Sequence, residues 1–348
     1  HMASGYARVT RKPAVCVATS GPGATNLITA LATAYADSIP LIAITGQVSS
    51  ELLGKDVFQE ADIIGSAEPF VKYSYLVRDA REIPRIFKEA FHIASTGRRG
   101  PVLIDVPLDV QQKQIEYVPV NEVSIRGYKP TVKGNNLQIR KVVDVLSRAG
   151  KPLICVGGGT ILGNGEQVVR EFANKFHIPV VSTMMGIGVM PNEDPLYMGM
   201  LGTNGKPHAN YAVHECDVLV LVGARVADRA VVKPYKLERR NTTIVHIDVD
   251  PAEIGKNLGT TVPLVGDVHV IFENLLQYEI PGDYTAWNEE LAEKKAAYVD
   301  RRHFNPDFVN PCRFVQTLSG KMNDDAIYVA DVGQNQLWSA DNYVMKHG

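Results

Sequence analysis

The sequence has few cysteines and no long apolar run, and each shortage excludes a class of protein. No run approaches the ~20 apolar residues that span a bilayer, and no basic leader precedes an apolar segment. The cysteines lie far apart without a Cys-x-x-Cys pair, which argues against a disulfide framework or a zinc site and favours buried, reduced thiols. They are Cys16, Cys155, Cys216 and Cys312. We expect no membrane span and a cytoplasmic location, with an organelle left open because His1 need not be the natural start.

Neither sign of charge dominates the chain. Lysine and arginine total 36 against 38 aspartates and glutamates, and no block of five like charges occurs. This pattern argues against nucleic-acid binding and against a polybasic membrane contact. With 348 residues, 45% of them hydrophobic, the chain is long enough for two or three globular domains. The expected partner is a small molecule, with no nucleic acid and no membrane.

Short apolar runs alternate with helical patterns over residues 1–117. The runs predict strands over 14–18, 39–44 and 101–106, and the helical spacing predicts helices over 26–35 and 83–94. Continuous apolar strands separated by helices are typical of a parallel sheet covered on both faces. The predicted fold class is therefore α/β, with doubly wound parallel sheets.

The same pattern returns after residues 118–135, which lose the periodicity and predict a linker. Residues 136–283 form a second predicted α/β domain, of the nucleotide-binding type. Its helices are predicted over 137–149, 167–176 and 268–278, and its strands over 152–156, 179–182, 218–222 and 243–248.

A charged connection over 284–308, helical around 289–298, leads to a third region, residues 309–348. That region predicts a helix over 311–322 and a strand over 326–330. One strand and its helices cannot bury a core, so we expect this domain to be incomplete.

The turn Thr19–Asn26 follows a predicted strand and opens a predicted helix. Free backbone N–H groups and the positive end of a helix at such a turn suit an anion. A tight strand-to-helix turn that requires two glycines explains the same residues. The motif alone leaves both interpretations open.

A longer series of motifs resembles the large catalytic subunit of acetohydroxyacid (acetolactate) synthases, and it keeps that family's order over nearly the whole chain. The series comprises GYAR at 5–8, ATSGPGATN at 18–26, ITGQV at 44–48, FQEAD at 58–62, GR at 97–98, GPVLID at 100–105, GGG at 157–159, GARVADR at 223–229, HIDVDPAEIGKN at 246–257 and DVGQNQLW at 331–338. The resemblance implies a pyrimidine-binding domain of the thiamine-diphosphate-binding fold over 1–117, an FAD-binding central domain over 136–283 and the start of a diphosphate-binding domain over 309–348.

The resemblance also implies an activity, its cofactors and its partners. Decarboxylation of pyruvate and condensation with a second 2-keto acid would give 2-acetolactate or 2-aceto-2-hydroxybutyrate, in branched-chain amino-acid biosynthesis. The implied cofactors are thiamine diphosphate, Mg²⁺ and FAD, and the implied partners are 2-keto acids, further copies in a homodimer or tetramer, and a regulatory small subunit. The family's catalytic glutamate is expected upstream of His1 and its metal-binding Gly-Asp-Gly beyond Gly348. We therefore expect a chain cut at both ends, without metal ligands and inactive alone.

Within the chain the resemblance assigns Gln59 and Arg229 to catalysis. An arginine fork donates two parallel hydrogen bonds to a carboxylate, which suits an acceptor keto acid. A surface arginine paired with Asp228 is the alternative. Gln59 would position a keto-acid oxygen. Phe58 would line the cofactor cleft with Gly23 and Ala24, and its alternative is a core aromatic.

The remaining assigned residues would bind cofactors. The FAD set is Arg98, Gly157, Gly158, Gly159, Thr183, Met184, Gly223, Arg225, Asp248 and Asp267. The diphosphate set is Val332, Gly333, Gln334 and Asn335. Those of the central domain follow predicted strands, and open α/β sheets bind ligands at that edge. A sharp turn explains the glycines equally, and helix caps explain the aspartates.

Several positions depart from the family pattern. Leu108 stands where lysine is common, Thr203-Asn204 where Met-His is usual, Val226-Ala227 where Phe-Asp is usual, and Asn335 where a histidine is expected. These differences leave open a sister enzyme, such as a glyoxylate carboligase or a pyruvate oxidase, or an inactive FAD-binding fragment.

Overall fold

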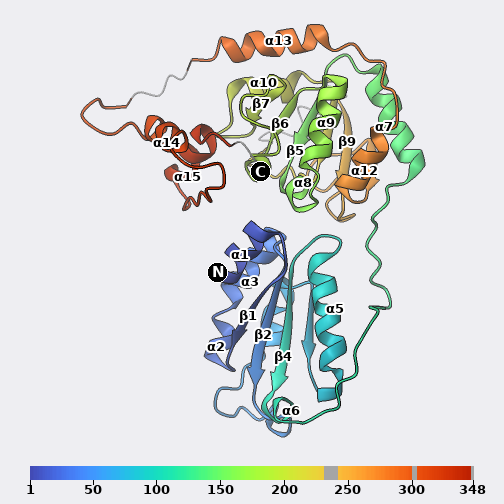
Figure 1. The fold of residues 1–348 in the computed structure, drawn as a ribbon, viewed down its shortest axis with the longest axis vertical. Coiled ribbons are helices and arrows are strands. Elements are labelled where there is room, and N and C mark those ends of the chain that lie inside the picture. The colour runs from blue at the N-terminus through green and yellow to red at the C-terminus, as the bar shows by residue number, and fades with distance from the viewer. Residues whose placement is uncertain (231–241, 300–303, 346–348) are drawn as a thin grey trace. The chain divides into compact units, whose positions relative to one another are not determined.

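The computed structural model describes residues 1–230, 242–299 and 304–345. The chain divides into two compact units, His1–Pro130 and Thr131–Gly348 (Figure 1). Each unit is built on a parallel sheet, as predicted. In the described ranges no helix is long and apolar enough to cross a membrane.

The sheet of the first unit has the order β1-β2-β4-β3, and all pairs are parallel. Its strands are β1 (Ala14–Ala18), β2 (Leu41–Gln47), β3 (Tyr73–Leu76) and β4 (Pro101–Pro107). Its helices are α1 (Met2–Thr10), α2 (Pro22–Thr25), α3 (Ile28–Ala36), α4 (Ile63–Ala67), α5 (Ile83–Ser95) and α6 (Leu108–Gln111), with 3-10 turns η1 (Ser50–Leu52), η2 (Glu68–Phe70) and η3 (Ala80–Glu82).

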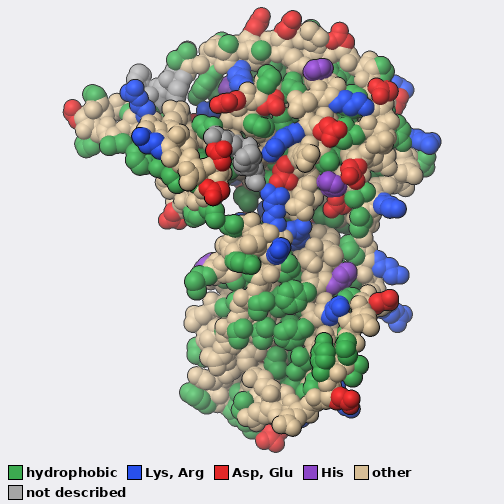
Figure 2. Space-filling model, in the orientation of Figure 1, with side chains coloured by type: hydrophobic (Ala, Val, Ile, Leu, Met, Phe, Trp, Pro, Cys, Tyr) green, Lys and Arg blue, Asp and Glu red, His purple; other side chains and the backbone are tan. Residues whose placement is uncertain are grey.

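Helices cover both faces of this sheet. One apolar cluster joins α1, α3 and α4 to it, and a second joins α5 to the opposite face. The edge strand β1 is covered on one face only, because Val15 and Val17 are 45% and 73% exposed. Figure 2 shows apolar side chains gathered on the visible face of this unit. The predicted doubly wound sheet is confirmed.

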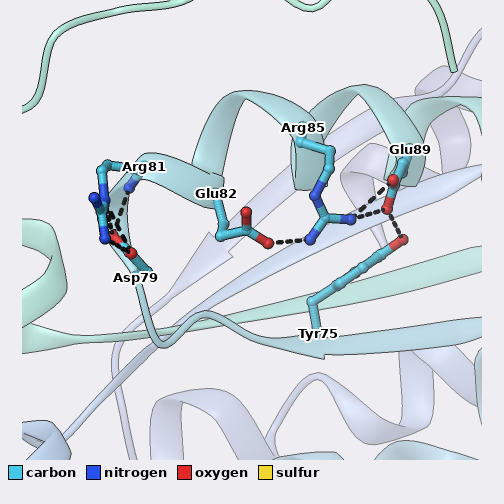
Figure 3. Close-up of polar contacts among 6 residues, drawn as sticks. All are labelled: Tyr75, Asp79, Arg81, Glu82, Arg85 and Glu89. Carbon is cyan, nitrogen blue, oxygen red and sulfur yellow. Dashed lines mark hydrogen bonds and ion pairs between the residues drawn. The ribbon is translucent and has the colours of Figure 1, made fainter.

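A polar network joins α5 to the edge strand β3 (Figure 3). The buried carboxylate of Glu89 accepts a hydrogen bond from the Tyr75 hydroxyl at 2.9 Å and two from one nitrogen of Arg85, each at 2.8 Å. The other terminal nitrogen of Arg85 pairs with Glu82. Burial and the bond to Glu89 raise the pKa of Tyr75, so the phenol stays a neutral donor.

In the second unit the described residues form a sheet with the order β10-β9-β8-β5-β6-β7, again parallel throughout. The chain adds strands from β5 to one edge and then returns to add β8, β9 and β10 on the other side. The order therefore reverses between β5 and β8, as in doubly wound dinucleotide-binding sheets. The strands are β5 (Pro152–Val156), β6 (Val180–Ser182), β7 (Tyr197–Met200), β8 (Val218–Val222), β9 (Thr243–Asp248) and β10 (Val262–Val265).

Helices cover both faces of the second sheet as well. One apolar cluster contains α7 (Asn136–Arg148), α9 (Glu166–Phe176) and α12 (Val268–Leu275), and the other contains α10 (Pro207–Glu215) and α13 (Thr285–Ala296). The short α8 (Gly158–Leu162) follows β5, and the 3-10 turn η4 (Met184–Gly186) follows β6.

The predicted strand over 326–330 is wrong. These residues belong to no strand, and Ile327 and Val329 are 64% and 84% exposed. A strand needs a neighbour for its hydrogen bonds, and in the described residues no strand pairs with this segment. Tyr328 instead packs on Tyr343 at 4.4 Å between ring centroids. The region is organised by α14 (Pro311–Ser319) against α15 (Gln334–Asn342).

All four cysteines are free thiols. Three are buried as expected, whereas Cys16 on the edge strand β1 is only half-buried, because that strand has a neighbour on one side only.

Candidate functional site

The loops after β1 and β2 meet at the carboxyl edge of the first sheet. Gly21 has φ +61°, and a side chain there would lie 2.9 Å from the backbone of Gln59. Gln59 itself adopts φ +58°. Gly23 and the buried Ala24 follow in α2. The structure thus brings the predicted turn residues next to the predicted glutamine.

Phe58 is 88% exposed, which excludes the core-aromatic interpretation. Its loop is braced by Glu60, whose carboxylate accepts hydrogen bonds from the backbone N–H of Gly54 and, at 3.1 Å, of Val57. These bonds lower the pKa of Glu60 and keep it an acceptor. Phe58 and the exposed Gln59 therefore project from an ordered loop and are accessible to a ligand.

A buried polar cluster at the same edge escaped the sequence analysis. The Asp105 carboxylate on β4 accepts hydrogen bonds from Thr45 Oγ1 at 2.7 Å and Gln47 Nε2 at 3.1 Å, both on β2. Burial raises the pKa of Asp105 to about 6, although the two hydrogen bonds oppose that rise. The sequence feature that could have revealed this cluster is a single carboxylate, Asp105, within an otherwise apolar and fully buried strand.

Arg98 lies apart from these residues. It precedes β4, and its Nε donates to the Ser38 hydroxyl at 3.0 Å, ahead of β2, while its guanidinium lies 5.7 Å from the ring centroid of Tyr35. Because all strands here run parallel, Arg98 is at the amino edge of the sheet, opposite Gly23 and Gln59.

In the second unit, Gly157, Gly159 and Gly223 lie together between the ends of β5 and β8. A side chain on Gly157 would lie 2.3 Å from the Gly223 carbonyl oxygen, and the Gly159 N–H donates to that oxygen at 2.9 Å. The Gly157 N–H donates to Val222. These glycines are therefore required by close approach of two backbone segments, at the point where the strand order reverses. Gly158, between them, is half-buried.

The segments after β6 and β8 reach the same edge. The Thr183 N–H donates to the Val156 carbonyl at 2.9 Å, which ties its segment to the end of β5. Met184 begins η4 and is half-buried, and Arg225 is exposed after β8. The structure thus gathers the predicted central-domain residues from β5, β6 and β8.

Each of the two predicted aspartates accepts a hydrogen bond from a backbone N–H group two or three residues further along the chain. Asp248, at the end of β9, is buried, and its Oδ1 accepts from the Asp250 N–H at 2.9 Å. Asp267 precedes α12, and its Oδ1 accepts from the Val270 N–H at 3.3 Å. Asp267 is thus a helix cap, the alternative that the sequence left open.

Arg229 has a fixed backbone and an accessible side chain. Its carbonyl accepts from the Thr203 N–H at 3.0 Å, and a side chain on Gly202 would lie 2.2 Å from the same oxygen. Its Nε is 3.9 Å from Asp228 Oδ2, and the two side chains are 83% and 88% exposed. Such an exposed pair is weak, so the guanidinium is available to a carboxylate.

The predicted diphosphate residues stand at the start of α15. Val332 is 83% exposed, and a side chain added to Gly333, at φ +124°, would meet no atom within 4 Å. Gln334 and Asn335 are exposed too. Across the part of the chain that is described, no group of three or more His, Cys, Asp or Glu is placed to hold a metal ion.

Two family models match this chain. The N-terminal TPP binding domain of thiamine pyrophosphate enzymes matches residues 1–66, and the central domain of thiamine pyrophosphate enzymes matches residues 139–275. Together they cover more than half of the sequence. The chain belongs to the thiamine pyrophosphate (thiamine diphosphate) enzymes.

Within this family the chain is similar to acetolactate synthases. It is 45% identical to the acetolactate synthase of Arthrospira platensis over 97% of this chain and 60% of that protein. It is 42% identical to the probable acetolactate synthase large subunit of Methanocaldococcus jannaschii, over 99% and 60%. It is also 42% identical to the acetolactate synthase large subunit of Corynebacterium glutamicum, over 98% and 55%. The resemblance seen in the sequence is confirmed, and the chain spans about 60% of the length of the first two relatives.

Proposed function

We propose that this chain is part of an acetolactate synthase, which decarboxylates pyruvate and condenses it with a second 2-keto acid to 2-acetolactate or 2-aceto-2-hydroxybutyrate. The observation that carries the proposal is the sequence identity of 42–45% to proteins of that name over nearly the whole chain. The pathway is branched-chain amino-acid biosynthesis.

The carboxyl edge of the first sheet fits a cofactor and its substrate. An exposed aromatic and an exposed amide project there from a braced loop beside the Gly21 turn. Thiamine diphosphate, when bound, supplies the electron sink for decarboxylation and carbon–carbon bond formation. Gln59 donates from its amide to a keto-acid oxygen, Phe58 shields that oxygen from water, and Arg229 binds the acceptor carboxylate.

The carboxyl edge of the second sheet fits a dinucleotide such as FAD. Open α/β sheets bind nucleotides where the strand order reverses, and that point lies between Gly157–Gly159 and Gly223. Thr183, Met184, Arg225 and Asp248 lie around it, Asp267 contributes by capping α12, and Arg98 of the first unit is proposed as a further FAD-binding residue. Mg²⁺ is expected with the cofactor diphosphate. In the described residues no cluster of metal ligands is present for it.

The domain arrangement and partners follow the family. Residues 1–117 form the pyrimidine-binding domain, 136–283 the central domain and 309–348 the beginning of the diphosphate-binding domain. They are joined by a linker over 118–135 and by a connection over 284–308, whose helix α13 packs on the central sheet. Val332, Gly333, Gln334 and Asn335 contact the cofactor diphosphate. The protein works in the cytoplasm as a homodimer or tetramer, and a regulatory small subunit is its partner, because several relatives are named large subunits.

The test is an activity assay on full-length protein. With thiamine diphosphate, Mg²⁺ and FAD supplied, pyruvate alone should give acetolactate, detected as acetoin after acid treatment. Preference for glyoxylate would indicate a sister carboligase, and oxygen uptake in step with pyruvate loss would indicate an oxidase. Absence of all three activities would contradict the proposal.

A further inference from the structure

The buried cluster of Thr45, Gln47 and Asp105 is placed by strand register. Thr45 on β2 pairs with Asp105 on β4, and Gln47 lies two residues beyond Thr45. Alternate residues of a strand share a face, so all three side chains lie on one side of the sheet. Their exposures are 0%, 7% and 1%, which means that each polar atom needs a partner within the protein.

The Gln47 amide is fully bonded in one orientation. Its Nε2 donates to Asp105 and, at 2.8 Å, to the Ala61 carbonyl, while its Oε1 accepts from the Val48 N–H at 2.9 Å. An ionised carboxylate and a carbonyl only accept hydrogen bonds, so both require the nitrogen. Asp105, the Ala61 carbonyl and the Val48 N–H therefore all favour the same orientation of the amide, with its nitrogen toward Ala61.

Ala61 ends the loop that carries Phe58 and Gln59. Glu60 braces that loop from within, and at the opposite end the Ser50 N–H donates to Asp109 of α6 at 2.8 Å. The bond from Gln47 ties the Ala61 end. Because Gln59 packs against Gly21, a shift at Ala61 would move Gln59 relative to the turn.

We propose that Gln47 and Asp105 are positioning residues, which hold the Phe58–Gln59 loop against the Gly21 turn through the Ala61 carbonyl. They act on the loop backbone and contact neither candidate side chain. The consequence for catalysis rests on the proposed function, whereas the order of the loop does not.

The test measures loop order in the 348-residue chain without cofactor or substrate. Gln47→Met removes both donated bonds, and Asp105→Val removes the acceptor at a similar size. Hydrogen exchange of the amides over 54–62, and trypsin cleavage after the exposed Lys55, should both rise about fivefold or more in each variant.

Two matched variants distinguish positioning from general loosening of the sheet. Thr45→Val removes the other bond to Asp105 and should leave exchange over 54–62 unchanged. Asp105→Asn should restore wild-type exchange, since its Oδ1 accepts from Gln47 and its Nδ2 donates to the Thr45 hydroxyl. Unchanged exchange in both Gln47→Met and Asp105→Val, or equal loosening in Thr45→Val, would overturn the proposal. If Gln47→Met does not fold, the Asp105→Val and Asp105→Asn pair decides.

The catalytic consequence is measured separately on the full-length enzyme. Gln47→Met should raise KM for the acceptor keto acid by about fivefold or more, with a smaller change in kcat. If the full-length protein makes no acetolactate, the proposed function fails while the exchange result still tests the positioning role. Loosened exchange with an unchanged KM would overturn the catalytic consequence alone.

Discussion

At the scale of single residues, Asp105 makes folding depend on pH. Its pKa rises from 3.8 to about 6 on folding, chiefly through burial. Because the folded state binds the proton more tightly than the unfolded state, ionisation of Asp105 lowers the free energy of unfolding. This loss of stability is absent below about pH 3.8, grows as the pH rises and reaches its full size above about pH 6. Asp105→Asn should therefore be more stable than wild type at about pH 8, by about 1–3 kcal/mol, and the difference should shrink as the pH falls toward about 4.

Urea unfolding at several pH values checks this prediction, and Asp109→Asn is its control. Hydrogen bonds from Ser50 lower the pKa of Asp109, so its contribution has the opposite sign. That variant should be less stable than wild type at about pH 8, with the difference lost as the pH falls. A gap between Asp105→Asn and wild type that stays constant with pH would contradict the argument.

Arg229 offers the residue-scale test of substrate binding. In full-length enzyme, Arg229→Lys keeps the charge but loses the planar fork, so KM for the acceptor keto acid should rise about tenfold or more. Steady-state kinetics with varied acceptor measure the change. Asp228→Asn should leave KM unaltered, because the 3.9 Å pair is exposed and weak. Equal effects of the two substitutions would favour a surface ion pair instead.

At the scale of elements, the sequence predicted most reliably the strands that lie inside a sheet between two other strands. The predicted bounds of β1, β5, β8 and β9 are those observed, and all of these strands except β1 have a neighbour on both sides. The strands β3, β7 and β10 were not predicted, and all three lie at sheet edges. Their patterns are short, and β10 contains Pro263, which an edge strand tolerates. The strand predicted over 326–330 was wrong for a related reason. An apolar run has the composition of a strand, but it does not reveal whether a partner strand exists.

The same limit applies to the candidate site. The sequence pattern predicted a strand-to-helix turn over 19–26 and a turn at Gly157, because such turns are marked by glycines, whereas the family resemblance alone assigned Gln59. The Asp105 cluster was missed because its partners, Thr45 and Gln47, are distant in the sequence and meet only through the pairing of β2 with β4. Long-range register of this kind is set by tertiary packing, not by local pattern.

The network between α5 and β3 predicts that substitutions of two nearby arginines, Arg85 and Arg81, change the stability of the protein by different amounts (Figure 3). Arg85→Met leaves the Glu89 carboxylate, 11% exposed, without its ionic partner. The variant should lose about 1–2 kcal/mol of unfolding free energy, less than a fully buried pair would, because Arg85 is 44% exposed. Arg81→Met, which breaks the exposed pair with Asp79, should have little effect. Denaturant midpoints compare the two variants, and equal losses would contradict the role assigned to Glu89.

The close approach of β5 and β8 predicts that Gly223 tolerates no side chain. Gly223→Ala places a Cβ 2.6 Å from the Gly159 backbone at φ +54°, and both backbone segments would have to move. We expect a loss of more than about 3 kcal/mol, whereas Gly255→Ala, at φ +72° with its nearest neighbour at 3.5 Å, should lose only about 1 kcal/mol. Urea unfolding measures both. Similar losses would mean that backbone conformation, not crowding, explains Gly223, and would weaken the case for a nucleotide site there.

At the scale of the whole chain, the stretch between the two units is attached to the first unit through Ile125 and Tyr128. Residues 113–125 contain no helix or strand, and Lys113 and Arg126 are exposed. Tyr128 is attached to the first unit, because its hydroxyl donates to the Thr96 carbonyl at 2.8 Å and accepts from Lys72 Nζ at 2.9 Å. Burial raises the pKa of Tyr128, so the phenol remains a donor at neutral pH.

This attachment predicts the order of proteolytic cleavage. A protease needs several residues of unfolded backbone, so trypsin should cut after Lys113 before it cuts after Arg126, which lies two residues from the anchored tyrosine. Mass spectrometry of timed digests identifies each cut. Tyr128→Phe removes the hydroxyl and should bring cleavage after Arg126 to the rate seen at Lys113. Tyr117→Phe, at a side chain that is 70% exposed, should change neither rate. Unaltered cleavage after Arg126 in Tyr128→Phe would mean that the apolar contacts of the ring, and not its hydrogen bonds, attach the linker to the first unit.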